Sequence, residues 1–135
     1  MLFRSDGISA TSFADLRKVP VQVCAEVAEI PSPAGVSMAG RVDWLRAAMQ
    51  GKWVELGDDY TTFRDRVVSF VRSIRVDTVI FSHFIAINAV IGSLTGDDRL
   101  VIRSLDNCSI TLLELDSSGA LHIVQSGDEA DTLIR

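Results

Sequence analysis

The feature that most constrains the fold is an uncharged stretch that covers residues 78–96. Its length approaches that of a membrane span, but polar residues such as Asn88 interrupt it and its apolar period changes partway. We therefore interpret it as a buried strand over residues 76–81 followed by a buried helix over residues 85–94, with Gly96 as the helix stop. A nearly continuous apolar strand is typical of a parallel sheet that is covered on both faces.

The remaining patterns predict helices on either side of that strand and a hairpin near the end of the chain. The clearest helix covers residues 63–74, where apolar positions repeat with a helical period. Strands over residues 110–115 and 121–124 are joined by a turn over residues 116–119. The shorter elements that we expect are a helix over 9–16, a strand over 19–23, a helix over 41–50 and a loop over 52–59. This order predicts an α/β fold in a single domain over residues 1–135.

Charge and cysteine content exclude several classes of function. The chain has 13 Lys and Arg against 18 Asp and Glu, a net charge of −5, whereas nucleic-acid binders need a dense basic face. We therefore expect no nucleic-acid partner. The N-terminus has no apolar stretch of the kind that signal peptides carry, so we expect a cytoplasmic protein without a membrane partner. Cys24 and Cys108 form no zinc-binding pattern, and we interpret them as reduced thiols in or near the core.

The two histidines differ in their sequence surroundings. His122 lies in the middle of a predicted strand, where an ordinary side chain on the outer face of the hairpin is expected. His83 ends an apolar strand and directly precedes a helix, so that it meets the backbone N–H groups and the positive end of that helix. Phosphate suits such a position. A histidine that only caps the helix or packs in the core stays open as the alternative.

Four segments together resemble one known family. Residues 77–88 resemble the strand, loop and helix around the second catalytic histidine of the histidine phosphatases, the phosphoglycerate-mutase-like superfamily. Residues 106–111 match the Asp-Asn-x-Ser opening of a later strand in that family. Residues 27–30 resemble the segment that carries its acidic proton donor, and the helix over 63–74 stands where the family has one. The segments occur in the family's order, and the resemblance covers residues 19–133.

The resemblance implies a partial phosphoglycerate-mutase-like sandwich, with a mostly parallel sheet, flanking helices and a C-terminal hairpin. It also implies transfer of a phosphoryl group from a phosphomonoester through a phosphohistidine, with no metal and no cofactor. His83 matches the second histidine, which spreads positive charge over the phosphoryl oxygens. Glu29 matches the acid that protonates the leaving oxygen. The backbone N–H of Phe84 matches the donor after the histidine, and Asp106 and Asn107 are expected to shape a turn.

The chain departs from the family at the nucleophile. The family's Arg-His-Gly signature opens its first strand, and this sequence contains no Arg-His pair. Residues 5–14 keep part of the family's second arginine motif, but Ser9 stands at the arginine and Phe13 at the threonine. We therefore expect a truncated domain, a pseudoenzyme that is inactive alone and takes a phosphate-containing small molecule. A non-catalytic phosphate-binding or protein-interaction module, and a truncated gene product without a selected role, stay open as alternatives.

The same resemblance makes two predictions about the structure. The family strand that is missing here lies between the strand before His83 and the strand over 110–115. Either these strands meet, or a second copy of the chain or a missing N-terminal segment fills the space, or the fold is marginally stable. Glu29 and His83 are expected at one end of the sheet, within about 10 Å of each other. The residues that either contact an anionic substrate tail or form a solvated face are Arg41, Arg46 and Lys52.

Overall fold

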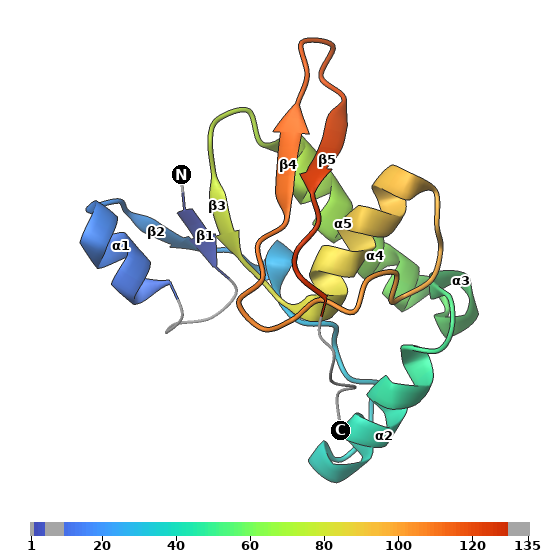
Figure 1. Cartoon of the computed structure of the whole chain (residues 1–135). Helices are drawn as coiled ribbons and strands as arrows, with labels where there is room; N and C mark the ends of the chain where they lie inside the picture. The colour runs from blue at the N-terminus through green and yellow to red at the C-terminus, as the bar shows by residue number, and fades with distance from the viewer. Residues whose placement is uncertain (1, 5–9, 130–135) are drawn as a thin grey trace.

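The computed structural model describes residues 2–4 and 10–129, and Figure 1 shows the course of the chain. Short strands and turns dominate the first third, helices the middle, and a hairpin the end. In chain order the elements are β1 (Leu2–Arg4), α1 (Thr11–Arg17), β2 (Val21–Val23), the 3-10 turn η1 (Ala25–Val27), α2 (Met38–Ala48), α3 (Trp53–Leu56), α4 (Asp58–Ser73), β3 (Val79–Phe81), α5 (Phe84–Thr95), β4 (Leu112–Leu115) and β5 (Leu121–Gln125).

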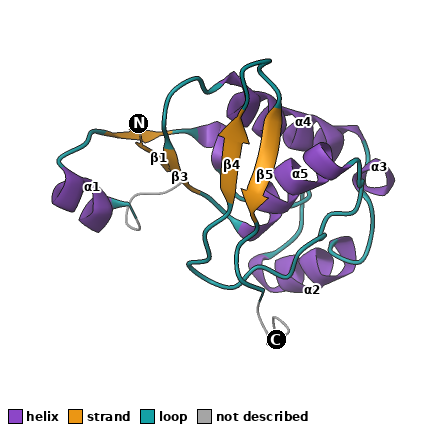
Figure 2. Cartoon of the chain, turned by 45° about the horizontal axis from the view of Figure 1, so that its top comes forward, coloured by secondary structure: helices purple, strands orange, loops and turns teal. Residues whose placement is uncertain are grey.

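The strands of the described residues form two separate sheets, so the fold is mixed α/β. One sheet is parallel, in the order β2-β1-β3, and the other is the antiparallel hairpin of β4 and β5. Among the described residues the expected mostly parallel sheet is not shown, because only three short strands are parallel and the other two form the separate hairpin. Direct pairing between the strand before His83 and the strand over 110–115 is likewise wrong for the described residues, because β3 pairs with β1 while β4 pairs with β5. Figure 2 shows the two sheets from a second direction.

The strand before His83 is shorter and more exposed than the apolar run predicts. Only three residues of the run, Val79–Phe81, form β3. The side chains of Val76 and Val79 are 59% and 42% exposed, so burial on both faces is wrong. The physical reason lies in the sheet itself, because its described strands are three residues long and cannot cover a longer neighbour.

Two helices begin earlier than their apolar patterns predict. α2 starts at Met38 because the Ser37 hydroxyl accepts the N–H of Gly40 at 3.2 Å and caps the helix. α4 starts at Asp58, five residues before the start of the predicted helix. Its first turn carries two aspartates, which favourably oppose the positive end of the helix dipole.

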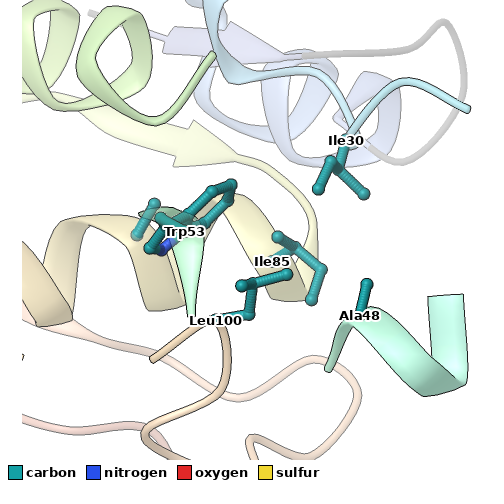
Figure 3. Packing of buried hydrophobic residues seen from close by; sticks show 6 residues of the cluster. Ile30, Ala48, Trp53, Ile85 and Leu100 are labelled. Carbon is teal, nitrogen blue, oxygen red and sulfur yellow. The ribbon is translucent and has the colours of Figure 1, made fainter. Parts of the chain in front are cut away.

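The segment predicted as a loop over 52–59 contains the most deeply buried aromatic residue of the core. Trp53 opens the short helix α3, and the backbone N–H of Lys52 donates to Glu55 Oε2 at 2.9 Å. The Trp53 ring packs 6.0 Å from that of Phe63 on α4. Figure 3 shows Trp53 together with the other buried members of this cluster, Ile30, Ala48, Ile85, Ala89 and Leu100. α3 is therefore part of the core rather than a connection.

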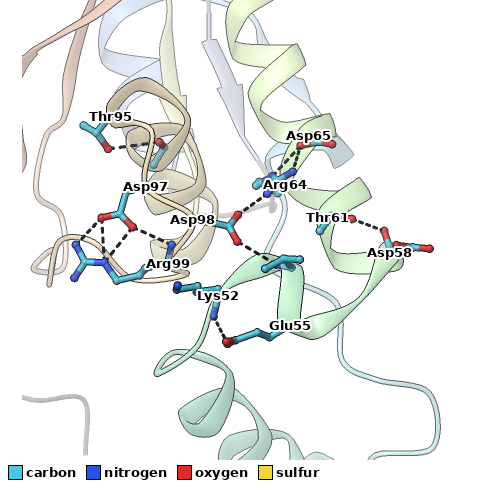
Figure 4. Close-up of polar contacts among 12 residues, drawn as sticks. Lys52, Glu55, Asp58, Thr61, Arg64, Asp65, Thr95, Asp97, Asp98 and Arg99 are labelled. Carbon is cyan, nitrogen blue, oxygen red and sulfur yellow. Dashed lines mark hydrogen bonds and ion pairs between the residues drawn. The ribbon is translucent and has the colours of Figure 1, made fainter.

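Polar contacts hold the loop after α5 against α3 and α4 (Figure 4). The carboxylate of Asp98 accepts the guanidinium of Arg64 at 2.7 Å and the backbone N–H of Val54 at 3.2 Å. The backbone N–H of Trp53 donates to the Asp98 carbonyl at 3.0 Å. These bonds satisfy backbone groups at the start of α3 that the helix itself leaves without partners.

α5 matches its prediction closely. It covers Phe84–Thr95 and ends at Gly96, which adopts a left-handed φ of 70°. Its one buried polar side chain is Asn88, which is fully buried and makes four hydrogen bonds. The amide donates to the carbonyls of Phe84 and Arg103, both at 3.1 Å. Its oxygen accepts the N–H groups of Ile102 and Arg103 at 2.8 and 2.9 Å. Asn88 therefore fixes the segment after α5 onto the helix.

The C-terminal hairpin is confirmed with its turn. β4 pairs antiparallel with β5, and Gly119 takes a φ of 85° in the connection. The Asp116 carboxylate accepts the N–H groups of Ser118 and Ala120, at 2.8 and 3.0 Å, and contacts His122 Nε2 at 2.6 Å. Contacts to Ser118 and His122 together hold the pKa of Asp116 well below its usual range. His122 is thus an exposed hairpin residue, as its position predicted.

Candidate functional site

The candidate site lies at the carboxyl edge of the parallel sheet. In the β2-β1-β3 sheet, Arg4 pairs with both Val23 and Phe81, so all three strands end at the same edge. η1 and then Glu29 follow β2 at this edge, whereas Ser82 and His83 follow β3. Ligands commonly bind at the carboxyl ends of parallel strands. The topology therefore brings two segments that are far apart in sequence to one place.

The structure brings Glu29 and His83 together. Glu29 Oε2 lies 3.8 Å from His83 Nδ1, and each side chain is 31% exposed. The other carboxylate oxygen of Glu29 accepts the backbone N–H of Ile30 at 2.8 Å, which orients the side chain. The expected separation of under about 10 Å is met. A half-buried carboxylate and imidazole at this distance can exchange a proton through a ligand or a water molecule.

The backbone places His83 at the start of α5. His83 is the N-cap residue, with φ −111° and ψ 158°, and its carbonyl accepts the N–H of Ile87 at 3.0 Å. The first N–H groups of a helix, here beginning with that of Phe84, have no acceptor within the helix and favour an anion. The first turn of α5 carries no acidic residue. Because the Phe84 ring packs against the Trp53 cluster, Phe84 offers a ligand its backbone N–H.

Sequence reasoning did not predict the role of two residues that hold this site together. The Ser82 hydroxyl donates to the Val27 carbonyl at 2.8 Å, between the end of β3 and the end of η1. The Arg41 guanidinium donates to the Ile30 carbonyl at 3.1 Å and to the Ser32 hydroxyl. The only available signal for Ser82 was its place beside His83. Arg41 had no signal, because its partners are backbone and hydroxyl groups nine to eleven residues away.

The three basic residues that were candidates for contact with an anionic substrate tail make different contacts in the structure. Arg41 contacts the chain itself rather than facing solvent alone. Arg46 lies on the exposed side of α2, where it forms a 3.5 Å ion pair with Asp43. The backbone of Lys52, the N-cap residue of α3, forms an isolated bridge with Arg99.

The two cysteines differ in exposure, and only Cys108 departs from the expected place in or near the core. The Cys24 thiol is half-buried and donates to Glu26 Oε2 at 2.9 Å, and burial followed by this contact raises its pKa to about 11. Cys108 is exposed, which corrects its expected place in or near the core. It occupies a left-handed position, with φ 62°, in the turn that Asp106 closes by accepting the N–H of Ser109 at 3.2 Å. Asn107 donates its N–H to Asp106 Oδ1 at 2.8 Å, so both residues shape the turn as predicted.

Other kinds of site were sought among the described residues. Surface grooves of about 430 and 360 Å³ lie against the hairpin, and neither is lined by Glu29 or His83. In residues 2–4 and 10–129 no group of three His, Cys, Asp or Glu side chains is placed to hold a metal ion. Within the same residues no helix combines the length and the apolar character needed to cross a membrane.

Comparison with known proteins places the chain in a family. No curated protein and no solved structure matches it. A family model described as histidine phosphatase superfamily (branch 1) matches residues 9–128. That span includes the Glu29 segment, the strand and helix around His83, and the hairpin. Since the match covers most of the 135 residues, the chain belongs to the histidine phosphatase superfamily.

Proposed function

We propose that this chain binds phosphate groups of small molecules at the edge formed by Glu29, His83 and the start of α5. The observation that carries the proposal is the 3.8 Å approach of Glu29 Oε2 to His83 Nδ1 at a helix N-terminus, in a chain of this superfamily. In this arrangement the His83 ring faces the phosphoryl oxygens. The N–H of Phe84 binds one of these oxygens, and Glu29 lies where a leaving oxygen takes up a proton.

The 135 residues by themselves turn over phosphomonoesters at a negligible rate. Phosphoryl transfer in this superfamily needs a nucleophilic histidine, and the sequence has no Arg-His pair to supply it. Loss of a covalent nucleophile lowers the rate of a well-studied hydrolase by about 10⁶-fold. His122 cannot replace the nucleophile because it lies on the hairpin, in contact with Asp116. The residual function is binding, with a dissociation constant of about 1 mM, which corresponds to about 4 kcal/mol.

A protein-interaction role is the second candidate, and the exposure of β3 favours it. Within the described residues β3 pairs with β1 alone, and Val79 in β3 and Val76 just before it are 42% and 59% exposed. A strand from a second copy of the chain, or from a segment that precedes it, would pair with such an edge. Sedimentation of the 135-residue chain across a hundredfold concentration range tests self-association. A mass that stays that of one chain throughout rules out the second copy as the strand donor.

Titration with inorganic phosphate, followed by NMR of the histidine rings, tests the binding proposal. The chain has only two histidines, so each ring signal can be assigned from one variant, His83→Ala or His122→Ala. We expect the His83 signal to move with a millimolar dissociation constant while the His122 signal stays in place. His122→Ala is the matched control and should keep the wild-type affinity. Equal movement of both signals, or none, would contradict a site at His83.

An aryl-phosphate assay tests the inactivity of the chain. We expect no turnover above that of the His83→Ala variant. Turnover that depends on His83 would overturn the assignment as a pseudoenzyme and would require a nucleophile elsewhere in the chain.

A further inference from the structure

The carboxylate of Glu29 is carried by a segment with little regular structure of its own. Residues 28–36 connect η1 to α2 without helix or strand. One residue on each side of Glu29 is nevertheless almost completely buried. Val27, two residues before it, and Ile30, directly after it, are each 1% exposed. The placement of Glu29 beside His83 therefore depends on what fixes this connection.

Side chains from two other elements bind the segment on both sides of Glu29. Two residues before Glu29, the Val27 carbonyl accepts the Ser82 hydroxyl at 2.8 Å. One residue after Glu29, the Ile30 carbonyl accepts Arg41 Nη2 at 3.1 Å, and the Ser32 hydroxyl accepts Arg41 Nη1. The guanidinium therefore spans two acceptors with its two terminal nitrogens. A planar fork of donors suits this geometry, and a lysine ammonium on a flexible stem does not reproduce it.

The two donor side chains, Ser82 and Arg41, come from elements that differ in their relation to the site. Ser82 directly precedes His83, so the strand end that presents the imidazole also binds the segment that presents the carboxylate. Arg41 comes from the first half of α2. Arg46, on the same helix, makes only an exposed ion pair with Asp43 at 3.5 Å. Arg41 and Arg46 thus carry the same charge and lie on the same helix, but only Arg41 binds the segment that carries Glu29.

We propose that Arg41 and Ser82 are positioning residues, which hold Glu29 Oε2 against the His83 ring. The inference rests on the proposed function for its biological meaning, but the placement itself can be tested without a ligand. If Arg41 acts through Glu29, its removal displaces the carboxylate and changes the magnetic surroundings of His83. If Arg41 merely stabilises the fold, the His83 ring stays as it is.

The experiment measures the His83 ring signal of the full chain in the absence of phosphate. The variants are Arg41→Met, Glu29→Gln and the double variant, and Arg46→Met is the control because it makes the same change on the same helix. We expect Arg41→Met to move the signal by at least half of the displacement that Glu29→Gln causes. In the Glu29→Gln background, Arg41→Met should cause no further movement. Arg46→Met should leave the signal unchanged.

Further variants keep the inference falsifiable if Arg41→Met is poorly folded. Arg41→Lys retains the charge but cannot span both acceptors, so an intermediate displacement is expected. Ser82→Ala, measured with and without Glu29→Gln, should show the same dependence on Glu29. Equal effects of Arg41→Met in the two Glu29 backgrounds would overturn the inference. A His83 signal that responds to Arg41→Met but not to phosphate would overturn the proposed function and leave the positioning role intact.

Discussion

The parts of the molecule on either side of Glu29 have very different cores. The helical part, built from α3, α4 and α5, buries large side chains, and Trp53, Ile85 and Leu100 are each at most 1% exposed. The N-terminal part, with β1, β2 and α1, buries only Ala10 and Ala14 in its described cluster. Figures 1 and 2 both show α1 at the margin of the molecule. Because apolar burial supplies most of the folding free energy, the helical part should be the more stable one.

The difference matters because the candidate site joins the two parts. His83 caps α5, and Ile85, two residues later, belongs to the Trp53 cluster. Glu29 follows β2 of the N-terminal part, but its neighbour Ile30 is buried in that same cluster. The acid-bearing segment is therefore attached to the stable part of the molecule. We expect the site to outlast a loosening of β1, β2 and α1.

Removal of the Trp53 side chain should have the largest effect on stability. Trp53→Ala leaves a large cavity in the helical part and should lower the free energy of unfolding by about 3–5 kcal/mol. Val54→Ala is the matched control on the same short helix, because Val54 is 67% exposed. Its effect should stay within about 0.5 kcal/mol. Urea unfolding followed by circular dichroism measures both. Equal losses would show that α3 does not anchor the core.

Asn88→Ala should have the second largest effect and should lower the free energy of unfolding by about 2–4 kcal/mol. The change leaves the N–H groups of Ile102 and Arg103 and the Arg103 carbonyl without the amide that binds them, and each unsatisfied buried group costs about 1–3 kcal/mol. Backbone relaxation toward water recovers part of this cost. Ser93→Ala is the control on the same helix, since Ser93 makes only a 3.4 Å contact with Arg72. If both variants unfold at the same urea concentration, Asn88 does not fix the loop to α5.

The elements with a local sequence signal were the predictable ones in both parts. The uncharged run and Gly96 predict α5 almost to the residue, because local periodicity and a glycine stop determine its ends. The turn at 116–119 follows from its residue types in the same way. The strand β1 escaped prediction, since three residues carry no period and their pairing with β2 and β3 is set by tertiary contact. α3 is four residues long and escaped for the same reason.

The candidate site likewise contains residues that the sequence predicted and contacts that it did not predict. Glu29 and His83 were reached through their resemblance to the family's motifs, and the structure places them 3.8 Å apart. The contacts that Ser82 and Arg41 make in the site were not predicted, because each side chain donates to a backbone carbonyl. A carbonyl is present at every residue, so no sequence pattern marks which one a side chain will bind. Contacts of that kind become visible only once the chain is folded.

Phe13→Ala should lower the free energy of unfolding by about 1–2 kcal/mol, less than Trp53→Ala or Asn88→Ala. The Phe13 ring on α1 lies 6.0 Å from that of Phe81 on β3, at an interplanar angle of 60°. Phe13 is only half-buried, so less apolar area is lost than at Trp53. Hydrogen exchange should accelerate in α1 and β2 while α5 keeps its protection. Acceleration of α5 to the same extent would mean that the two parts unfold as one unit.

The smallest effect is kinetic and concerns the thiol of Cys24, which follows β2. Burial and the contact with Glu26 raise its pKa to about 11, so at pH 8 about a hundredfold less thiolate is present than at an ordinary thiol value of about 9. A raised thiol pKa also means that the folded form binds this proton more tightly than the unfolded chain. The contribution of the protonated Cys24 thiol to folding stability is fully present below pH 9, the ordinary thiol pKa. It is lost as the pH rises toward about 11.

Iodoacetamide labelling of a Cys108→Ser variant at pH 8 therefore reports how often the N-terminal part opens. We expect Cys24 to react at least tenfold more slowly in the native chain than in urea-unfolded chain, with exposed Cys108 in a Cys24→Ser variant as the fast reference. Low urea should speed the labelling of Cys24 before tryptophan fluorescence changes, because β2 opens while the Trp53 cluster stays closed. Labelling and fluorescence that change together would show that the small alanine core is as stable as the large aromatic one. The contrast between the two parts would then have no consequence for their unfolding.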